Sequence, residues 1–309
     1  MPRSQIWKSV LMSFAAVLTS AAPLLSQQSL TAALHVKLEA QLANIAEHLD
    51  GVIGYAIKDL ATGETFERLP DTVFPEASSI KLTILLELLR QAQEGRASLD
   101  EKHTLRRSEM PVGDTDPILT MLGDGTVTLS LRDLATFMVV LSDNTATNIL
   151  IDRLGMDNIN AGIVRLGLRE TKLRRRMIDL DAAKKGNENV STPREMLTLL
   201  EKVRAGQALD AVHTEEYWRL LRLHKESEFH KALPEDAPIA DKPGALEAVR
   251  CDTGLIEIAG HPLIMSIQTT YLAHDADGER AVEDVARLAY DYFTRLGRST
   301  SYGRVISYK

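Results

Sequence analysis

The segment Phe74–Leu86, FPEASSIKLTILL, joins a serine and a lysine to an apolar, leucine-rich run. The length and composition of residues 79–91 predict a buried helix that begins just after Ser78. A lysine three residues after a serine lies on the same helix face, so Lys81 could take the proton of Ser78 and make it a nucleophile. Burial, and a second cation for which Lys242 is the candidate, would favour the neutral amine that this step needs. The helix N-terminus would also direct backbone N–H groups to the place where an oxyanion develops.

By itself this serine-lysine pair is weak evidence, because a chain of this size contains about one Ser-x-x-Lys by chance. The alternative is a surface serine beside a lysine whose stem lies along apolar surface. Two later strings of residues, 142–144 and 242–244, decide between the two interpretations.

The string Ser142-Asp143-Asn144 follows an apolar segment, 128–141, that is predicted to be helical. It therefore lies on a turn between two helices. There Ser142 could relay a proton to a leaving group while the Asn144 amide holds a substrate amide by hydrogen bonds. The alternative is a helix N-cap, for which Ser, Asp and Asn are all favoured, and Asp143 fits that role.

The string Lys242-Pro243-Gly244 precedes a predicted strand, 246–257. Lys242 would supply positive potential, and Gly244 would let a ligand approach the backbone so that the Ala245 N–H helps to bind an oxyanion. Arg250, further along the same predicted strand, could bind a substrate carboxylate. The alternative is an ordinary turn, which Lys-Pro-Gly also favours.

The rest of the chain predicts strands at both ends around a helical middle. Apolar spacing predicts a helix over 30–49 and another over 279–296, and residues 98–235 are expected to be mostly helical, most clearly at 128–141 and 193–205. Strands are predicted at 51–58, 65–68, 246–257 and 263–272, with turns at 61–63, 113–114, 123–125 and 186–187. This order favours one sheet built from the two termini, with a helical insertion packed beside it.

Composition limits the function further. The 309 residues are 44% hydrophobic and carry a formal charge of −7, enough for a large core and unfavourable for nucleic-acid binding. The eight histidines show no zinc-like pair at helical spacing with a carboxylate, and no glycine-rich phosphate loop occurs. No metal or organic cofactor is therefore expected. The single cysteine, Cys251, excludes an internal disulfide and is expected to be buried in a strand.

Residues 1–26 have the features of a secretory signal peptide: Arg3 and Lys8 precede an apolar run, 10–18, and small residues follow at 20–22. The apolar run is too short to span a bilayer, and a buried first helix is the alternative. Export to a bacterial periplasm or cell surface is expected, without a stable membrane anchor after cleavage. Cleavage would take the formal charge to about −9. A monomer acting on a small-molecule substrate is expected.

Jointly, the three strings resemble the motifs of class A β-lactamases and related penicillin-binding proteins. The resemblance extends over most of residues 30–297, including the segments 74–86, 126–150 and 192–196. It implies an α+β fold, with an antiparallel sheet built from both chain ends and flanked by helices. The implied domains are an α/β domain at 27–90 and 236–309 and an all-helical domain at 91–235, with Ser78 at their junction.

Two departures from the family pattern bear on function. Class A enzymes carry a glutamate that activates the deacylating water, and its place here is taken by Met177, which cannot accept a proton; Asp179 and Asp181 are nearby, with a shifted register and short reach. Pro243 replaces the usual threonine of the last string, which removes a hydroxyl and an N–H donor near a ligand carboxylate. We therefore expect acylation chemistry to be present and rapid hydrolysis of the acyl-enzyme to be impaired.

The resulting hypothesis is a serine hydrolase that opens β-lactam amides through an acyl-enzyme. Alternatives are a D-Ala-D-Ala peptidase or esterase of the same superfamily, which the absence of the glutamate favours, and a non-catalytic module that binds cell-wall peptides or penicillin. The predicted catalytic residues are Ser78, Lys81 and Ser142, and the predicted substrate-binding residues are Asn144, Lys242, Gly244, Ala245 and Arg250. The backbone N–H groups of Ser78 and Ala245 would form the oxyanion hole.

Overall fold

The computed structural model describes residues 21–111, 125–300 and 302–305. Most of the predicted signal peptide, residues 1–20, lies outside the described residues, as do the turn at 113–114 and the first two residues of the turn at 123–125. The centre of the fold is a five-stranded antiparallel sheet with the order β2-β1-β9-β8-β7. Its strands come from both ends of the chain, which confirms the predicted topology: β1 Val52–Asp59, β2 Thr65–Arg68, β7 Ile239–Leu246, β8 Val249–Ile256 and β9 Leu263–Thr270.

One predicted strand boundary is wrong in a way that matters for the site. Residues 246–257 do not form a single strand: Leu246 ends β7, and β8 begins at Val249. The string 242–244 is not a turn but lies in the middle of β7, where Pro243 is tolerated because β7 is an edge strand and needs fewer backbone donors. The hairpin turns instead at Ala248, a non-glycine residue with φ 60°, so the turn carries no glycine or proline signal.

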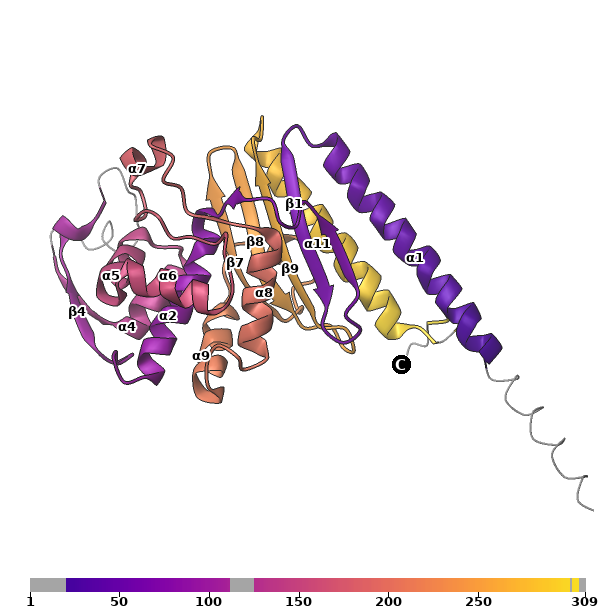
Figure 1. The fold of residues 1–309 in the computed structure, drawn as a ribbon, viewed down its shortest axis with the longest axis horizontal. Helices are drawn as coiled ribbons and strands as arrows, with labels where there is room; N and C mark the ends of the chain where they lie inside the picture. Colours follow the sequence, from indigo (N-terminus) through magenta and orange to yellow (C-terminus); the bar gives the residue numbers. More distant parts are fainter. Residues whose placement is uncertain (1–20, 112–124, 301, 306–309) are drawn as a thin grey trace, which may run out of the picture.

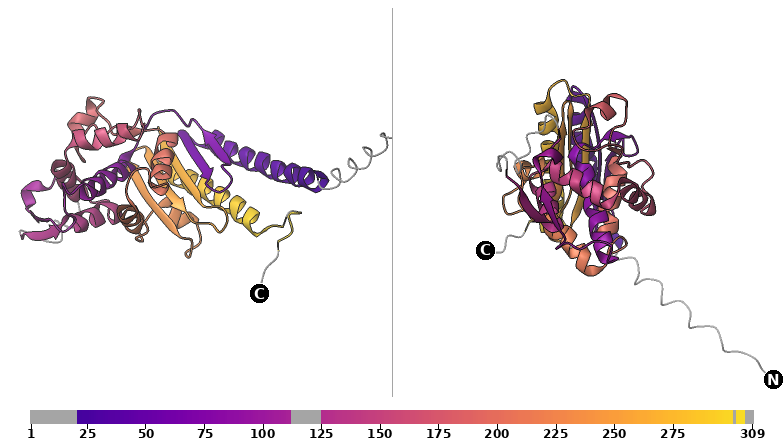
Figure 2. Two further views of the ribbon diagram at one scale, coloured as in Figure 1. Left: turned by 60° about the horizontal axis from the view of Figure 1, so that its bottom comes forward. Right: turned by 90° about the vertical axis from the view of Figure 1, so that its left-hand side faces the viewer.

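Helices cover both faces of the sheet (Figures 1 and 2). On one face lie α1 (Ala21–His48) and α11 (Asp275–Arg298), which pack on each other and on the sheet. Their apolar side chains form a core with Ile57, Ile256 and Ile267 of the strands. On the other face α8 (Pro193–Arg204) crosses β1 and β9. The predicted helices over 30–49, 193–205 and 279–296 are thereby confirmed, and two of them extend beyond the predicted bounds.

Most of the remaining helices form a group beside the edge strand β7 (Figure 1). Its central member is α2, whose residues 82–89 are all buried, as expected for a leucine-rich helix that packs on several neighbours. The helices of the group are α2 (Lys81–Gln93), α4 (Leu131–Val140), α5 (Asn144–Leu154), α6 (Met156–Arg165), α7 (Leu180–Lys184) and α9 (Ala211–Leu221). The short helix α10 (Glu228–Ala232) instead packs on α11 and β7, and its Phe229 joins the core under α1 and α11. Two 3-10 turns, η1 (Ala77–Ile80) and η2 (Arg107–Glu109), accompany them.

The middle of the chain also contains short strands that the prediction missed. β4 (Lys102–Leu105) pairs with β5 (Val127–Ser130), and β3 (Phe74–Pro75) pairs with β6 (Val190–Ser191). The predicted helix over 128–141 therefore begins too early, because Ser130 ends β5 and caps α4 by accepting a hydrogen bond from the Asp133 amide.

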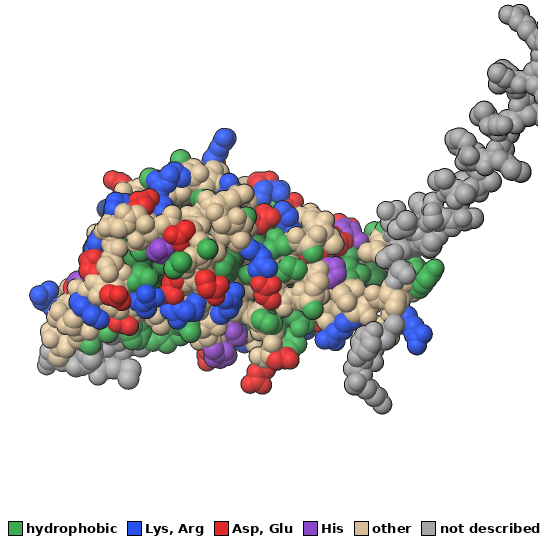
Figure 3. All heavy atoms as spheres, turned by 90° about the horizontal axis from the view of Figure 1, so that it is seen from below, with side chains coloured by type: hydrophobic (Ala, Val, Ile, Leu, Met, Phe, Trp, Pro, Cys, Tyr) green, Lys and Arg blue, Asp and Glu red, His purple; other side chains and the backbone are tan. Residues whose placement is uncertain are grey.

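Charges of both signs are distributed over the surface, and the face in Figure 3 intersperses basic with acidic side chains. None of the helices within the described ranges is long and apolar enough to cross a membrane. Those ranges also contain no group of three or more His, Cys, Asp and Glu side chains that could hold a metal ion.

Candidate active site

The serine of the first string lies on a short turn between β3 and α2. Ser78 belongs to η1, which leads directly into α2 at Lys81. Ala77, just before it, has φ 43°, a left-handed conformation that costs energy for a residue with a Cβ and is held only where the surroundings enforce it. Ser78 is partly exposed while Ser79 and Ile80 are buried. The turn therefore presents one serine to solvent at the N-terminus of a buried helix.

The first two strings meet through the lysine. Lys81 is buried, and its Nζ donates to the backbone carbonyl of Ser142 at 2.5 Å, to Ser142 Oγ at 3.1 Å and to Asn144 Oδ1 at 3.2 Å. These partners lie on the turn between α4 and α5, where Ser142 has φ 56°. Asp143 is the N-cap of α5, with its carboxylate 2.7 Å from the Ala146 amide, so it has the capping role suggested by its residue type.

The third string completes the group from the edge of the sheet. Lys242 is 1% exposed, and its Nζ lies 3.1 Å from Ser142 Oγ and 3.1 Å from the Pro243 carbonyl oxygen. The Ser142 hydroxyl therefore faces two lysine side-chain nitrogens, those of Lys81 and Lys242, each at 3.1 Å. A hydroxyl in this position can accept from one amine and pass its own proton on.

Burial lowers the pKa of Lys242 to about 8. The carboxylate of the neighbouring Asp241 raises this pKa and the ammonium of Lys225 lowers it, and both are smaller effects than burial. Lys242 is therefore a cation near neutral pH that can lose its proton within the range in which the protein can be assayed.

Asp241 and Lys225 form a buried ion pair on the opposite face of β7, with Lys225 Nζ 2.9 Å from Asp241 Oδ1. Burial alone would raise the pKa of Asp241, but His230, Ser227 and Lys225 outweigh it and lower this pKa to about 2. An ionised aspartate is thus buried directly behind Lys242. The sequence analysis missed this pair, although an aspartate beside the lysine of the third string was a usable signal.

Gly244 brings β7 against the serine turn. A Cβ built on Gly244 would lie 2.8 Å from the Ser78 amide nitrogen, 2.9 Å from the Ser79 amide nitrogen and 2.7 Å from Cys251 Sγ. No side chain fits there, so the glycine is required for the two segments to approach. Ser79 Oγ also donates to the Lys242 carbonyl at 2.9 Å. The backbone of Ala245, the next residue on this exposed edge, therefore lies close to that of Ser78.

Arg250 does not join this group. It lies on β8 opposite Ala245, and because side chains alternate along a strand it faces away from Cys251, which contacts the serine turn. Its guanidinium bonds to Glu279 at 3.0 Å and pairs with Asp275 at 3.0 Å. The structure thus commits Arg250 to α11 rather than to the surface near Ser78.

Met177 occupies the loop that leads from α6 to α7. Its side chain is buried, and its backbone is held from both sides by Asn148 of α5, which accepts from the Met177 N–H at 2.8 Å and donates to its carbonyl at 3.2 Å. The nearby carboxylates lie on α7: Asp179 is its exposed N-cap, and Asp181 follows in the first turn. The loop therefore carries an apolar thioether, which cannot accept a proton, at a position that the surrounding structure holds firmly.

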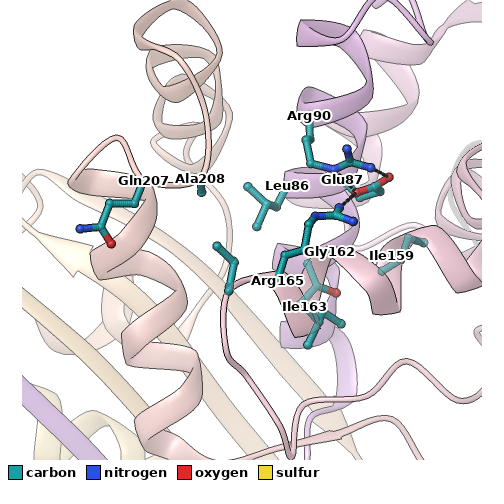
Figure 4. A pocket seen from close by; sticks show the side chains of 11 residues that line it. Leu86, Glu87, Arg90, Ile159, Gly162, Ile163, Arg165, Gln207 and Ala208 are labelled. Atoms are coloured by element: carbon teal, nitrogen blue, oxygen red, sulfur yellow. Dashed lines mark hydrogen bonds and ion pairs between the residues drawn. The ribbon is translucent and has the colours of Figure 1, made fainter.

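A separate cavity of about 150 Å³ lies between α2, α6 and residues 207–208. Figure 4 shows Arg90 and Arg165 directed toward the carboxylate of Glu87, which is almost fully buried. None of the residues that line this cavity belongs to the three strings. We interpret the ion pairs as a means of neutralising a buried carboxylate between two helices.

The structure thus brings residues of all three strings together in one site, and comparison with known proteins identifies the family of the chain. The chain belongs to the Beta-lactamase enzyme family, whose profile matches residues 37–293, and it is thus a member of a family of serine hydrolases related to the class A β-lactamases. This confirms the resemblance inferred from the three strings.

Individual relatives are moderately similar. The chain is 27% identical over 259 residues to β-lactamase SME-1 of Serratia marcescens, covering 81% of this chain and 86% of the relative. It is 27% identical to an imipenem-hydrolyzing β-lactamase of Enterobacter cloacae, covering 81% and 88%.

Solved structures share the fold. The β-lactamase of Sphaerobacter thermophilus superposes with a TM-score of 0.74 at 29% identity, covering 82% of this chain and 95% of that one. PBP-A superposes with a TM-score of 0.75 at 25% identity, covering 83% and 96%. A mutant of PBP-A was solved as an acyl-enzyme complex with penicillin G.

Proposed function

We propose that this protein reacts with β-lactams, and with amides or esters of similar shape, through an acyl-enzyme on Ser78. In the first step Ser78 Oγ forms a bond to the carbonyl carbon and gives its proton to the neutral amine of Lys81. The C–N bond of the amide then breaks, and the leaving nitrogen takes a proton through Ser142 Oγ. The backbone N–H groups of Ser78 and Ala245 stabilise the oxyanion between these steps.

One observation carries this proposal: Ser142 Oγ lies 3.1 Å from the amines of both Lys81 and Lys242. The hydroxyl thereby connects the base that activates Ser78 with the cation on the edge strand. Asn144, whose side chain accepts from Lys81, lies on the same turn and can bind a substrate amide. Lys242 attracts the substrate carboxylate, and Arg250 contributes through α11 packing rather than by direct contact.

A second candidate is a peptidase that cleaves D-Ala-D-Ala-like amides. The observation that favours it is Met177, a buried apolar side chain at the place where class A enzymes carry their deacylating glutamate. Without a base to activate water, a β-lactam acyl group would remain on Ser78 for a long time, whereas a peptide substrate leaves an acyl group without the bulky opened ring. Export to the periplasm or cell surface, as a monomer, belongs to both candidates and rests on the features of residues 1–26.

Two assays test the proposal: labelling of the protein with a fluorescent penicillin, and hydrolysis of nitrocefin. The wild-type chain and Ser299→Ala, a control at the end of α11, should take up one label per chain, located by mass spectrometry on the Ser78 peptide. Ser78→Ala should take up none. Label that turns over within minutes supports a β-lactamase, and label that persists for hours supports the peptidase. Equal labelling of wild type and Ser78→Ala, or labelling of neither, would refute the acyl-enzyme proposal.

A further inference from the structure

A buried acidic residue lies two positions before the reactive serine. Glu76 is 0% exposed, and its backbone organises the serine turn: its N–H donates to the Asn189 carbonyl at 2.9 Å, and its own carbonyl accepts from the Ser79 N–H at 2.9 Å and from Cys251 Sγ at 3.2 Å. Only Ala77, in its left-handed conformation, separates it from Ser78. A displacement of Glu76 would therefore move the Ser78 amide directly.

The side chain of Glu76 is bonded on one oxygen only. Gln268 of β9 donates from Nε2 to Glu76 Oε1. The other carboxyl oxygen, Glu76 Oε2, and the amide oxygen, Gln268 Oε1, are both buried and have no hydrogen-bond partner within the described part of the chain. Each is an acceptor when the carboxyl group is ionised, so neither can satisfy the other.

A single added proton would give both unsatisfied oxygen atoms, Glu76 Oε2 and Gln268 Oε1, a hydrogen bond. A proton on Glu76 Oε2 turns that oxygen into a donor, and Gln268 Oε1 is the acceptor that remains in the pair. Acid and amide then share two hydrogen bonds in a ring, with N–H to Oε1 and O–H to the amide oxygen. Buried polar groups are almost always satisfied, which favours the protonated form over an ionised carboxylate with a single bond.

We propose that Glu76 is a positioning residue that works as a neutral carboxylic acid, paired with Gln268 through two hydrogen bonds beneath the serine turn. This pair holds the Ser78 amide against Gly244, and removal of the proton loosens the turn. The proposal rests on the function proposed above, because it assigns Glu76 a task only if Ser78 is the nucleophile.

The surroundings of Glu76 agree with a neutral side chain. Burial raises its pKa to about 8, although the Gln268 hydrogen bond lowers it. Of the groups that face it, Cys251 on β8 is titratable, and burial raises the pKa of this thiol well above its ordinary value. Gln268 on β9 and Asn189 before β6 do not titrate. Asp252 and Glu228, on the opposite face of the sheet, act on the Cys251 thiol and raise its pKa further.

The test must separate Glu76 from Lys242, because the pKa of each is about 8. Glu76→Gln places an amide where the acid was, and two amides can form the same ring of two hydrogen bonds at any pH. Glu76→Leu removes both bonds. Gln268→Leu removes the partner while keeping the acid.

Infrared spectroscopy detects the protonation state of Glu76 and does not depend on enzymatic activity. The wild-type chain should show a carbonyl band of a protonated carboxylic acid that disappears as the pH rises through about 8, and Glu76→Gln should lack this band. If the spectral change between low and high pH is identical in the wild-type chain and in Glu76→Gln, Glu76 is not a neutral acid. The proposal is then wrong, whether or not the protein reacts with penicillin. If the band is present but Ser78 takes up no penicillin, the proposed function fails and leaves Glu76 a structural acid.

The rate of acylation of Ser78 tests whether Glu76 has a positioning role. Near neutral pH, Glu76→Gln should acylate within about threefold of wild type, and Glu76→Leu and Gln268→Leu about tenfold more slowly, since each loses at least one buried hydrogen bond. Above pH 8 the rate should fall less steeply in Glu76→Gln than in wild type, because only Lys242 still titrates. Equal slopes in the two proteins, or a Glu76→Gln variant as slow as Glu76→Leu at pH 7, would overturn the proposal.

Discussion

Replacing Gly244 by alanine tests how closely the edge strand must approach the reactive serine. The added Cβ would lie 2.8 Å from the Ser78 amide nitrogen, which is 0.6 Å short of the 3.4 Å at which ordinary contact begins. The Ser79 amide at 2.9 Å and Cys251 Sγ at 2.7 Å are crowded as well. Because two of these three neighbours are backbone atoms, no side-chain rotation relieves the contact, and η1 and β7 must separate.

Moving η1 and β7 apart has two consequences, one for stability and one for the rate of acyl transfer. Overpacking of this kind lowers the free energy of unfolding by about 1–3 kcal/mol. Displacing an oxyanion donor lowers the rate of acyl transfer by about 10²–10³-fold. We therefore expect Gly244→Ala to remain folded but to acylate Ser78 at least about 100-fold more slowly than wild type.

The matched control is Gly297→Ala. A Cβ on Gly297, near the end of α11, would lie 2.8 Å from the backbone oxygen of Ala259, so it also crowds the backbone, but away from the serine turn. Urea unfolding and second-order rates of fluorescent-penicillin labelling should show comparable destabilisation in both variants and slow labelling in Gly244→Ala alone. A Gly244→Ala variant that labels at the wild-type rate would refute the placement of β7 against Ser78.

Three further predictions follow from other parts of the site. Because burial lowers the pKa of Lys242 to about 8, the KM for a penicillin with a free carboxylate should rise above pH 8. The KM for the corresponding penicillin ester, and the KM of the Lys242→Arg variant, should not change with pH. A pH-independent KM of the wild-type protein for the free carboxylate would contradict this prediction. Met177→Glu should shorten the lifetime of the acyl group on Ser78 by about 10²-fold or more by supplying a base, while Met177→Gln should not, as followed by loss of the mass adduct. Lys225→Met should lower the free energy of unfolding by about 3–5 kcal/mol at pH 7, because it strands the carboxylate of Asp241. Since the pKa of Asp241 is lowered to about 2, this contribution is complete above pH 4 and is lost as the pH falls toward 2, so urea titrations of the two proteins should converge in acid.

Local patterns were sufficient for most elements of the fold. The apolar spacing of residues 30–49 and 279–296 predicts two helices, and the positions of the apolar residues in each segment indicate which face of the helix is buried. The leucine-rich run after Ser78 likewise predicts α2. The prediction failed over 246–257, because the β7–β8 hairpin turns through Ala248 with φ 60°, and a left-handed alanine has no signature in the sequence. The misplaced turn put Arg250 on the same strand as Ala245, whereas the two residues lie opposite each other on β8 and β7.

The sequence by itself determined the family, the order of the three strings and the reactive types of residue, because these are properties of short segments. Tertiary structure decided which of those residues meet. Ser142 Oγ bonds to Lys81 and Lys242, which lie 61 and 100 residues away, and Arg250 faces α11 because strand register assigns side chains to faces. The burial of Glu76 was also decided there: an acidic residue is usually expected on the surface, and only the sheet beneath it, with Gln268 and Cys251 on one face, gives its carboxyl group a buried environment.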